Sequence, residues 1–592
     1  MYEALAIAVN RVDLGGLGGG SGRGGVRRTR SRYGGANLGV SMAGATQDTS
    51  ELGLREQFGT LGRVYWIANV MEMLERLAYY GLRVVVPVYM LLAVEAGGPE
   101  LDNVQKGQIF AIWAAVQSFV PVFSGGFADR FGYKRTVGVS IGVKIAGYLL
   151  MAWAVDLAAW WTAGASVGVR GHSAVYWTFL AGAVLLALGT AVFKPGLQGI
   201  ISTEIDARNG ALAWGLFYQI VNVGGFLGPF LAGAMRLLSW RYVFISCAVI
   251  VALNYVLLLT FDEPEKEADP RPTRGVLRVL YDSGQGVLKP RLFAFLAIFS
   301  GFWAMFYQLF DLLPNYIDDW IDSRAIVDVF VGPVLRAVGG SVPDAWGGNL
   351  PQEYMINLNA LLISIFAFAV GYATGRLRSM TAMVVGILVS AAGILALGAA
   401  TSGWIILLAI ATFSVGEMLA SPTKLRYLNH IAPPGQKALY LGYANATTGI
   451  GWSLGSLVAG ELYEAGGDRT VLARRHLVQV LGMPDATVEA LAKTDVMPTL
   501  AAQLGTDFWG AQEVLWQVYE PWRIWTWFAT IGVVSMLGLI AFDRISSRAA
   551  RWEAPALAAV TWIVCTICYD PFWGGVMGAA VLLGWLLHPK GA

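Results

Sequence analysis

The stretch Glu72-Met-Leu-Glu-Arg-Leu-Ala-Tyr-Tyr-Gly-Leu-Arg83 places four ionisable side chains inside an apolar segment that is long enough to cross a membrane. On an α-helix, with about 100° between successive residues, Glu72, Glu75, Arg76, Tyr79 and Arg83 share one stripe roughly 100° wide. Charged groups persist inside a membrane only where they face partners or water. The stretch therefore predicts a spanning helix whose polar face lines an interior pathway.

The composition sets the class of protein. The chain has 592 residues, of which 56% are hydrophobic and 14% are charged, and its formal net charge is +2. These values exclude an ordinary soluble domain and indicate an all-α integral membrane protein. The small net charge gives no support for binding nucleic acid. The three cysteines lie in apolar stretches and the four histidines are scattered, so we expect no metal site, no cofactor and no enzymatic centre.

Twelve apolar stretches of about 20 residues, the length that crosses a bilayer, follow one another along the chain. They are 64–93, 105–128, 136–157, 174–198, 210–235, 240–261, 291–317, 354–375, 380–400, 403–422, 438–463 and 522–543. A charged linker, 262–290, separates the sixth stretch from the seventh. This order predicts two six-helix halves, 58–261 and 291–543, around a central site.

The segments outside the spans carry the signals for topology. Residues 1–57, rich in Gly, Ser and Arg, predict a disordered N-terminal tail, and Met42 is an alternative start of the protein. Basic residues gather in the loops that follow even-numbered spans, such as Arg130, Lys134 and Arg135 after the second span. This distribution predicts a cytoplasmic N-terminus, and we expect a multi-pass protein of the bacterial inner membrane.

Two outer segments are unusually long, 319–352 and 464–520. The second contains helix-like pieces at 472–481 and 485–493, with Asp485 as the expected N-cap. These pieces predict a small helical cap on the outer face. The cap either gates the substrate or is a passive loop.

The C-terminal segment, 544–592, contains a last apolar run, 555–587, that Asp570 and Pro571 divide into two parts. Each part is about 15 residues long, which is short for a span. We expect two tilted helices that form an extra membrane hairpin. A single kinked span is the competing interpretation, and it places the C-terminus on the opposite side.

The first loop after an even-numbered span carries a known signature. It reads Gly125-Gly-Phe-Ala-Asp129-Arg130-Phe-Gly132-Tyr-Lys134-Arg135. This resembles the Gly-x-x-x-Asp-x-x-Gly-x-Lys/Arg signature of the major facilitator superfamily. Small residues allow close helix contact, and Asp129 can pair with basic residues or with a helix end. The resemblance implies a conformational latch that breaks when the two halves rock.

A second set of motifs narrows the resemblance. Glu72-x-x-Glu75-Arg76-Leu-Ala-Tyr79-Tyr-Gly81 is similar to the Glu-x-x-Glu-Arg-Phe-x-Tyr-Tyr-Gly motif of the proton-dependent oligopeptide transporter (POT) family. Further pieces recur in the family's order: Phe193-Lys194-Pro195, Phe217-Tyr218-x-x-x-Asn222-x-Gly224, Phe302-Trp303-Ala-Met-Phe-Tyr307-Gln308, Asn359, and Gly416-Glu417-x-x-x-Ser421-Pro422. The resemblance covers about residues 60–465 and, more weakly, 520–543. It implies the major facilitator fold for a divergent member, in which Tyr307 replaces an acid that is common in the seventh span.

The resemblance implies two groups of site residues. Glu72, Glu75, Arg76 and Lys194 are the expected proton-coupling residues, because a carboxylate paired with a cation changes its proton affinity when the pair breaks. A static buried ion-pair cluster is the competing interpretation.

The second group is expected to bind the substrate. Arg83 is expected to bind the carboxylate of a zwitterionic peptide and Glu417 its ammonium group. The resemblance adds Tyr79, Asn222 and Asn359 as hydrogen-bonding residues and Trp303 as an apolar wall; as a lone aromatic, Trp303 is equally explained by packing.

These expectations combine into one functional hypothesis. The chain is expected to import small peptides or a related small solute with protons, by alternating access across a lipid bilayer. A proton-linked exporter of drugs or metabolites, and a solute sensor that does not transport, are the alternatives.

Overall fold

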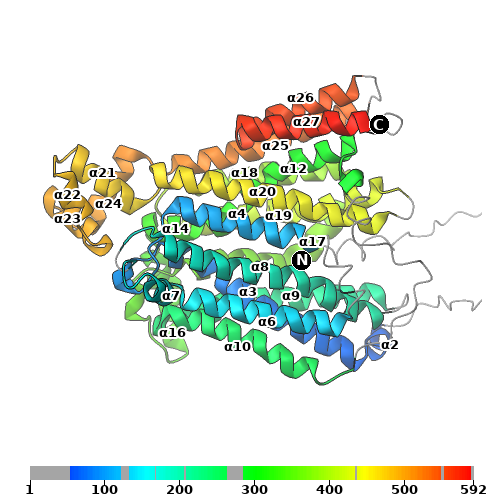
Figure 1. Ribbon diagram of the computed structural model, residues 1–592, viewed down its shortest axis with the longest axis horizontal. Helices are drawn as coiled ribbons and strands as arrows, with labels where there is room; N and C mark the ends of the chain where they lie inside the picture. Colours follow the sequence, from blue (N-terminus) through cyan, green and yellow to red (C-terminus); the bar gives the residue numbers. More distant parts are fainter. Residues whose placement is uncertain are drawn as a thin grey trace, which may run out of the picture.

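The computed structural model describes residues 54–121, 128, 132–166, 169–205, 209–262, 284–433, 436–547 and 552–587. Every regular element in these ranges is a helix, apart from one isolated bridge between Asp322 and Ser402. The predicted tail up to residue 53, most of the predicted linker, and Gly125, Asp129 and Arg130 of the predicted latch lie outside the described residues. Figure 1 shows the long helices running side by side.

The first half contains six long helices. They are α3 (Arg63–Leu91), α4 (Asn103–Phe119), α6 (Tyr133–Ala152), α8 (Ser173–Thr203), α9 (Gly210–Leu238) and α10 (Trp240–Leu258). Within this half α3 packs on α9, and α6 packs on α8 and α10. The expectation of disorder up to residue 57 is wrong at its end, because residues 54–57 form the first turn of α2 (Leu54–Gly59).

The second half repeats the arrangement. Its helices are α12 (Pro290–Phe306), α13 (Gln308–Asp311), α14 (Leu313–Trp320), α17 (Gln352–Gly375), α18 (Ser379–Ala396), α19 (Gly403–Ile431), α20 (Lys437–Gly466) and α25 (Arg523–Ser546). Within this half α18 packs on α19 and α25, and α12 packs on α20 and α25. The halves meet where α20 packs on α4 and where α17 packs on α9.

The seventh span differs from the prediction of one helix over 291–317. The structure breaks it at Tyr307 and Leu312 into α12, α13 and α14. Pro314 supplies a physical reason for the break at Leu312, because proline has no N–H and cannot donate to the carbonyl of Phe310 four residues earlier. The break therefore leaves a backbone acceptor in the middle of the bundle.

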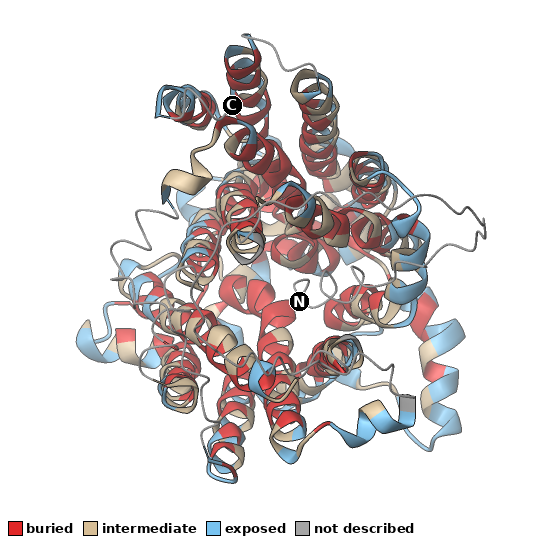
Figure 2. Cartoon of the chain, turned by 90° about the vertical axis from the view of Figure 1, so that its right-hand side faces the viewer, coloured by how far each residue is buried: buried red, intermediate tan, exposed pale blue. Residues whose placement is uncertain are grey.

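Within the described residues, nine helices are long and apolar enough to cross a membrane. α3 does not meet this test, and its sequence explains why, since Glu75, Arg76 and Arg83 fall within one stretch of its apolar length. Figure 2 shows that buried residues concentrate on the helix faces turned toward the middle of the molecule, with exposed residues at the periphery. The charges of α3 are therefore accommodated inside the protein, at 1–9% exposure for Glu72, Glu75, Arg76 and Arg83.

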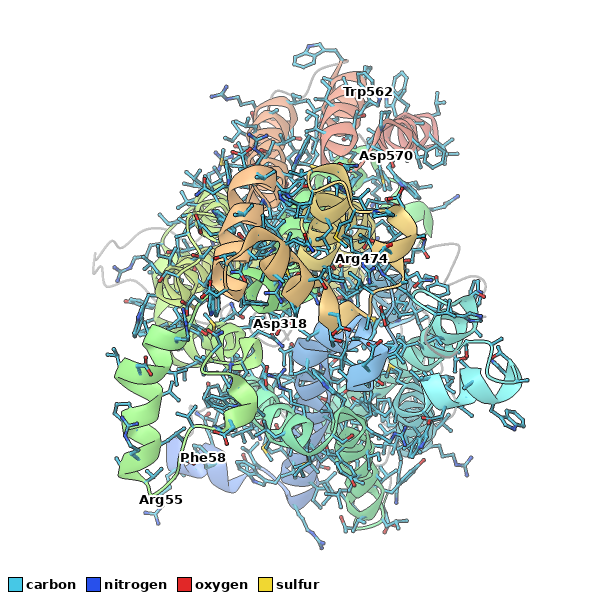
Figure 3. The ribbon with its side chains drawn as sticks, turned by 90° about the vertical axis from the view of Figure 1, so that its left-hand side faces the viewer. Arg55, Phe58, Asp318, Arg474, Trp562 and Asp570 are labelled. Atoms are coloured by element: carbon cyan, nitrogen blue, oxygen red, sulfur yellow. The ribbon has the colours of Figure 1, made fainter. Side chains whose placement is uncertain are left out.

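The insertion 464–520 forms a helical cap at one end of the bundle (Figures 1 and 3). The cap contains α21 (Arg469–Gln479), α22 (Asp485–Glu489), α23 (Val496–Leu504) and α24 (Phe508–Tyr519). The predicted N-cap role of Asp485 is wrong, because Pro484 is the N-cap and Asp485 is the first helical residue. Asp468 is an N-cap instead, and its carboxylate accepts a hydrogen bond from the Val471 amide at 3.0 Å. We call the end of the bundle that carries α21–α24 the capped end.

The C-terminal segment forms the predicted hairpin rather than one kinked span. α26 (Glu553–Cys568) and α27 (Pro571–Leu587) pack against each other and against α12. Asp570 starts the second helix, because its carboxylate accepts a hydrogen bond from the Trp573 amide at 2.8 Å. Glu553 pairs with Arg291 of α12, which ties the hairpin to the second half.

Candidate functional site

A cavity of about 500 Å³ lies between the two halves. Its walls contain all six predicted substrate-binding residues and two of the four predicted coupling residues. These are Tyr79, Arg83, Asn222, Trp303, Asn359 and Glu417, together with Arg76 and Lys194. The fold thus brings together residues from α3, α8, α9, α12, α17 and α19 that are far apart in the sequence.

The cavity extends away from the capped end. Its lining includes Gln198 near the end of α8 and Leu439 in the first turn of α20, both of which lie at the uncapped end. At the capped end the halves touch closely, because Gly107 of α4 faces α20 without a side chain. A Cβ at Gly107 would lie 2.5 Å from the Ser456 carbonyl oxygen, and one at Gly460 would lie 2.6 Å from the Asn103 carbonyl oxygen. The two glycines therefore permit the closure of this end.

The predicted coupling residues on α3 form a buried ion-pair cluster. Arg76 Nε lies 2.8 Å from Glu72 Oε1 and 3.2 Å from Glu75 Oε2. Helix α6 adds Lys144, whose Nζ lies 3.5 Å from Glu75 Oε1. Lys194 is the coupling lysine that the sequence predicts, and no motif marks Lys144. Lys194 lines the cavity and lies close enough to Glu72 for its charge to act on that carboxylate.

Arg83 lines the cavity and also makes a contact that the sequence did not indicate. Its guanidinium forms a buried ion pair with Asp311 of α13, and it donates a second hydrogen bond to the Phe310 carbonyl at 3.2 Å. That carbonyl is the one that Pro314 leaves without a helical donor. The Arg83 Cζ also lies 4.5 Å and 5.1 Å from the ring centroids of Phe110 and Trp452. In this conformation Arg83 therefore joins the two halves instead of awaiting a substrate carboxylate.

No sequence motif marks Asp311 as a site residue. It lies one turn beyond Tyr307, which stands where an acid is expected in the seventh span. Its Oδ2 accepts hydrogen bonds from Trp452 Nε1 at 2.9 Å and from Ser456 Oγ at 2.7 Å. Arg83 pairs with the other oxygen, Oδ1, and Asp311 is 2% exposed. Both carboxylate oxygens therefore have partners inside the protein.

Glu417 is held by polar neighbours in the second half. Asn359 Nδ2 donates to Glu417 Oε2 and to Ser414 Oγ, both at 2.9 Å. Glu417 lies in the cavity wall at 1% exposure, so its carboxylate is oriented before any ligand arrives.

The remaining predicted residues form the sides of the cavity. Tyr79 donates a hydrogen bond to Gln117 Oε1 at 3.0 Å, and Asn222 and Trp303 face the cavity from α9 and α12. Lys424 also lines the cavity, with Nζ 4.5 Å from the Trp303 ring centroid.

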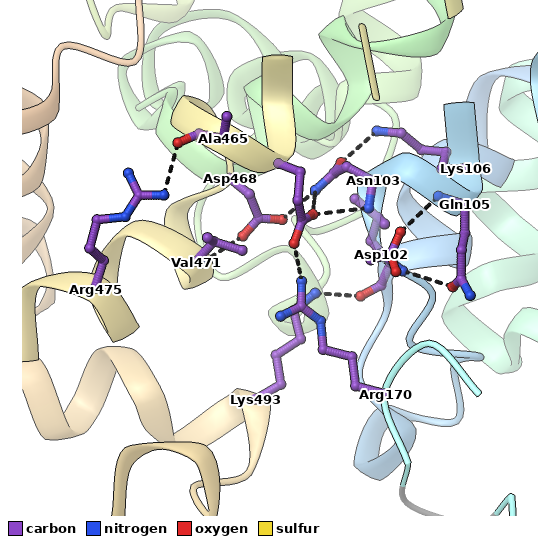
Figure 4. Close-up of polar contacts among 12 residues, drawn as sticks. Asp102, Asn103, Gln105, Lys106, Arg170, Ala465, Asp468, Val471, Arg475 and Lys493 are labelled. Carbon is purple, nitrogen blue, oxygen red and sulfur yellow. Dashed lines mark hydrogen bonds and ion pairs between the residues drawn. The ribbon is translucent and has the colours of Figure 1, made fainter. Parts of the chain in front are cut away.

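A polar network closes the capped end (Figure 4). Lys106 of α4 donates to Asn103 Oδ1 at 3.0 Å and crosses to Asn315 Oδ1 of α14 at 2.8 Å. Asn103 Nδ2 reaches Glu464 Oε2 at 2.9 Å and Asp468 Oδ2 at 3.0 Å. The cap takes part, because Lys493 Nζ donates to the carbonyl oxygen of Leu91 at the end of α3, at 2.5 Å.

Three residues of the predicted latch are described by the structure. Gly132 is the residue before α6, and Lys134 Nζ donates to the carbonyl oxygen of Phe261, just beyond the end of α10, at 2.5 Å. Arg135 follows in the first turn of α6. The latch role of these residues stays a prediction. In the part of the chain that the structure describes, no group of three or more His, Cys, Asp or Glu side chains is placed to hold a metal ion.

Comparison with known proteins gives two kinds of match. The profile of the Major Facilitator Superfamily matches residues 68–324. The chain is 25% identical over 356 residues to a Na(+), Li(+), K(+)/H(+) antiporter of Planococcus maritimus, covering 58% of this chain and 76% of that protein. It is 24% identical over 458 residues to the peptide transporter YePEPT of Yersinia enterocolitica, covering 66% of this chain and 85% of that protein.

Solved structures give the same fold. The crystal structure of a POT family transporter in complex with 5-aminolevulinic acid matches with a TM-score of 0.56 at 16% identity, over 81% of this chain and 96% of that chain. These matches confirm the predicted fold and the resemblance to the POT family that the motifs indicated.

The ion pair between Arg83 and Asp311 generates a first prediction. Removing one partner leaves a buried charge, so Arg83→Met and Asp311→Leu should each lower the free energy of unfolding by about 3–5 kcal/mol. The double variant should lose less than the sum of the two by at least about 1 kcal/mol. Thermal unfolding of the purified protein measures this, and additive losses would show that the contact is not energetically coupled.

A matched control is the exposed pair of Arg324 and Asp322, whose side chains are 46% and 35% exposed. Arg324→Met should change the free energy of unfolding by no more than about 1 kcal/mol.

Asp319 at the capped end generates a pH prediction. Burial, and then the negative charge of Asp468, raise the pKa of Asp319 from 3.8 to about 7. The folded protein therefore binds this proton more tightly than the unfolded chain does, and stability falls as the pH rises from about 4 to about 7. Between about pH 5 and pH 8, the melting temperature of the wild type should fall more than that of Asp319→Asn. An equal fall in both proteins would contradict this assignment.

Proposed function

We propose that this chain is a member of the major facilitator superfamily that imports small peptides or related zwitterionic solutes together with protons. The observation that carries the proposal is the buried Glu72–Glu75–Arg76 cluster beside a cavity that both halves line. Arg76 belongs to both, since it pairs with the carboxylates and also lines the cavity. A ligand whose negative charge pairs with Arg76 therefore weakens the pairing of Arg76 with Glu72 and Glu75.

Proton coupling follows from that shared residue. A carboxylate beside a cation stays ionised, whereas the same carboxylate buried without its cation favours the protonated form. If a substrate carboxylate pairs with Arg76 or Lys194, that cation is drawn away from Glu72 or Glu75. The buried carboxylate that loses its cation then favours binding a proton. Substrate and proton are then bound together, which is the requirement for symport.

The cavity suits a small zwitterion. Glu417 is the proposed partner of the substrate's ammonium group, and Arg76 and Lys194 lie across the cavity for its carboxylate. Arg83 remains a proposed carboxylate ligand in a conformation where its contact with Asp311 is broken. The POT family and peptide transporter matches support this substrate class.

Alternating access is supported by the unequal ends of the cavity. The capped end is closed by Arg83–Asp311, Lys106–Asn315 and Asn103–Glu464, which all join the two halves. The lining at Gln198 and Leu439 extends toward the other end. With the N-terminus in the cytoplasm of a bacterial inner membrane, as the basic loops suggest, this is a cytoplasm-facing state.

A second candidate function is proton-linked export. The antiporter of Planococcus maritimus supports it, since that relative exchanges cations for protons according to its name. Export would use the same carboxylate cluster but would move the solute against the direction of the proton.

The test of the proposal is uptake of the dipeptide Ala-Ala by proteoliposomes under an imposed proton gradient, acidic outside. The wild type should accumulate the peptide, and Lys194→Ala should abolish accumulation while keeping the protein folded in the membrane. Accumulation at the wild-type level in Lys194→Ala would refute the coupling role. Binding without accumulation in the wild type would favour a sensor, and gradient-driven efflux would favour an exporter.

The role of Glu417 gives a separate prediction. Loss of a charge-assisted hydrogen bond costs about 1.5–3 kcal/mol, so Glu417→Gln should weaken binding of peptides with a free ammonium group roughly 10- to 150-fold. N-acetylated peptides should bind the variant and the wild type equally. Competition against labelled Ala-Ala measures both constants, and an equal loss for blocked and unblocked peptides would make Glu417 a gate rather than a ligand.

A further inference from the structure

Lys144 is a lysine in the middle of α6 whose side chain is 0% exposed. A buried amine in a membrane-spanning helix is costly and usually marks a functional site. The packing around it is built for a long side chain, because α8 presents Gly189 at this level. A Cβ at Gly189 would lie 2.4 Å from Lys144 Cγ, so any larger residue would displace the lysine.

The amine is directed at the coupling cluster. Lys144 Nζ lies 3.5 Å from Glu75 Oε1, while Arg76 Nε lies 3.2 Å from Glu75 Oε2, so each oxygen of this carboxylate faces a different cation. The ring centroid of Phe193 lies 3.5 Å from Nζ and shields it from the side of α8. Glu75 on α3 and Phe193 on α8 thus hold the Lys144 amine between them.

The charged groups that act on Lys144 are Glu72, Glu75 and Arg76 of α3. Lys194 of α8 acts on Glu72 and so belongs to the same group of charges. On α10, the Cys247 thiol donates to the Ala78 carbonyl at 3.3 Å. Tyr148 lies one turn along α6.

The summed charge of Glu72, Glu75, Arg76, Lys144 and Lys194 identifies the proton that can leave. With all groups ionised, Glu72 and Glu75 contribute −2, and Arg76, Lys144 and Lys194 contribute +3, so the sum is +1. Loss of one proton from a lysine makes the group neutral. Arg76 does not lose its proton in proteins, and Lys194 is only partly buried, in the wall of the cavity. Lys144 is the cation that burial penalises most.

We propose that Lys144 and Glu75 together bind one coupling proton. In the proton-bound state the pair holds it as an ammonium beside a carboxylate, or as an amine beside a carboxylic acid after transfer from Nζ to Oε1. In the proton-free state Lys144 is a neutral amine and Glu75 keeps Arg76 as its counter-ion. The proton enters from water in the cavity and returns to water on the other side of the membrane. This inference rests on the proposed symport for its role in transport, but not for the binding of the proton.

The first test therefore needs no substrate. Potentiometric titration of the purified protein from about pH 6 to pH 9 should show that the wild type releases about one proton more per molecule than Lys144→Met. Ser140→Ala is the matched control, because Ser140 Oγ donates to the Gly189 carbonyl at 2.6 Å in the same helix interface without touching the cluster. It should titrate like the wild type. Identical proton release by Lys144→Met and the wild type would overturn the proposal.

The second test separates coupling from folding. In proteoliposomes, Lys144→Met should lose gradient-driven accumulation of Ala-Ala at least tenfold and keep exchange of Ala-Ala at equal pH on both sides. Wild-type accumulation in this variant would overturn the proposal. If the wild type itself does not accumulate Ala-Ala, the proposed function fails while the titration still decides the role of Lys144.

A second variant covers the case in which Lys144→Met does not fold. Gly189→Ala keeps the lysine but crowds its Cγ, so it should move the midpoint of proton release. An unchanged midpoint in Gly189→Ala would overturn the placement of the proton on Lys144.

Discussion

The contact of Arg83 with Asp311 and the Phe310 carbonyl is the constraint on which the arrangement of the two halves depends. Both charges are almost fully buried, and a buried charge that loses its partner costs several kcal/mol. The capped end can therefore open only if something replaces the partner of Arg83. A proton on Asp311 or a carboxylate from a ligand would each do so. Closure of one end of the cavity is thereby linked to what the cavity contains.

The same rule governs the carboxylate cluster two turns earlier on α3. Glu72 and Glu75 are tolerated because Arg76 and Lys144 neutralise them, and any change in one member alters the others. Arg83 and the Glu72–Glu75–Arg76 cluster lie on the same helix, α3. A movement of α3 that breaks the contact of Arg83 therefore also affects the contacts of the cluster. Pro314 contributes to the Arg83 contact indirectly. Because it has no N–H, it leaves the Phe310 carbonyl without a helical donor, and Arg83 donates to that carbonyl instead.

The helical stripe of α3 could be predicted from sequence because a period of about 3.6 residues brings its charges to one face. The partners of that stripe could not, since Asp311 and Lys144 reach it only through helix packing. A signal for Lys144 was present, as a lone basic residue inside the predicted span 136–157. For Asp311 the signal was an acid one turn beyond Tyr307, ahead of a helix-breaking proline. The cap was predicted in outline, but Asp485 was misplaced because the pattern of a short helix does not fix its first residue.

If the Arg83–Asp311 pair keeps the capped end closed, breaking it should change the distances across both ends of the bundle. The most direct measurement is the distance between spin labels on cysteines introduced at Glu95 and Asp344, which are exposed at that end, in a background without Cys247, Cys565 and Cys568. Asp311→Asn should widen this distance without ligand, while labels at Ser202 and Gln436, exposed at the uncapped end, should move closer together. Unchanged distances at both ends in Asp311→Asn would show that this ion pair does not hold the capped end closed.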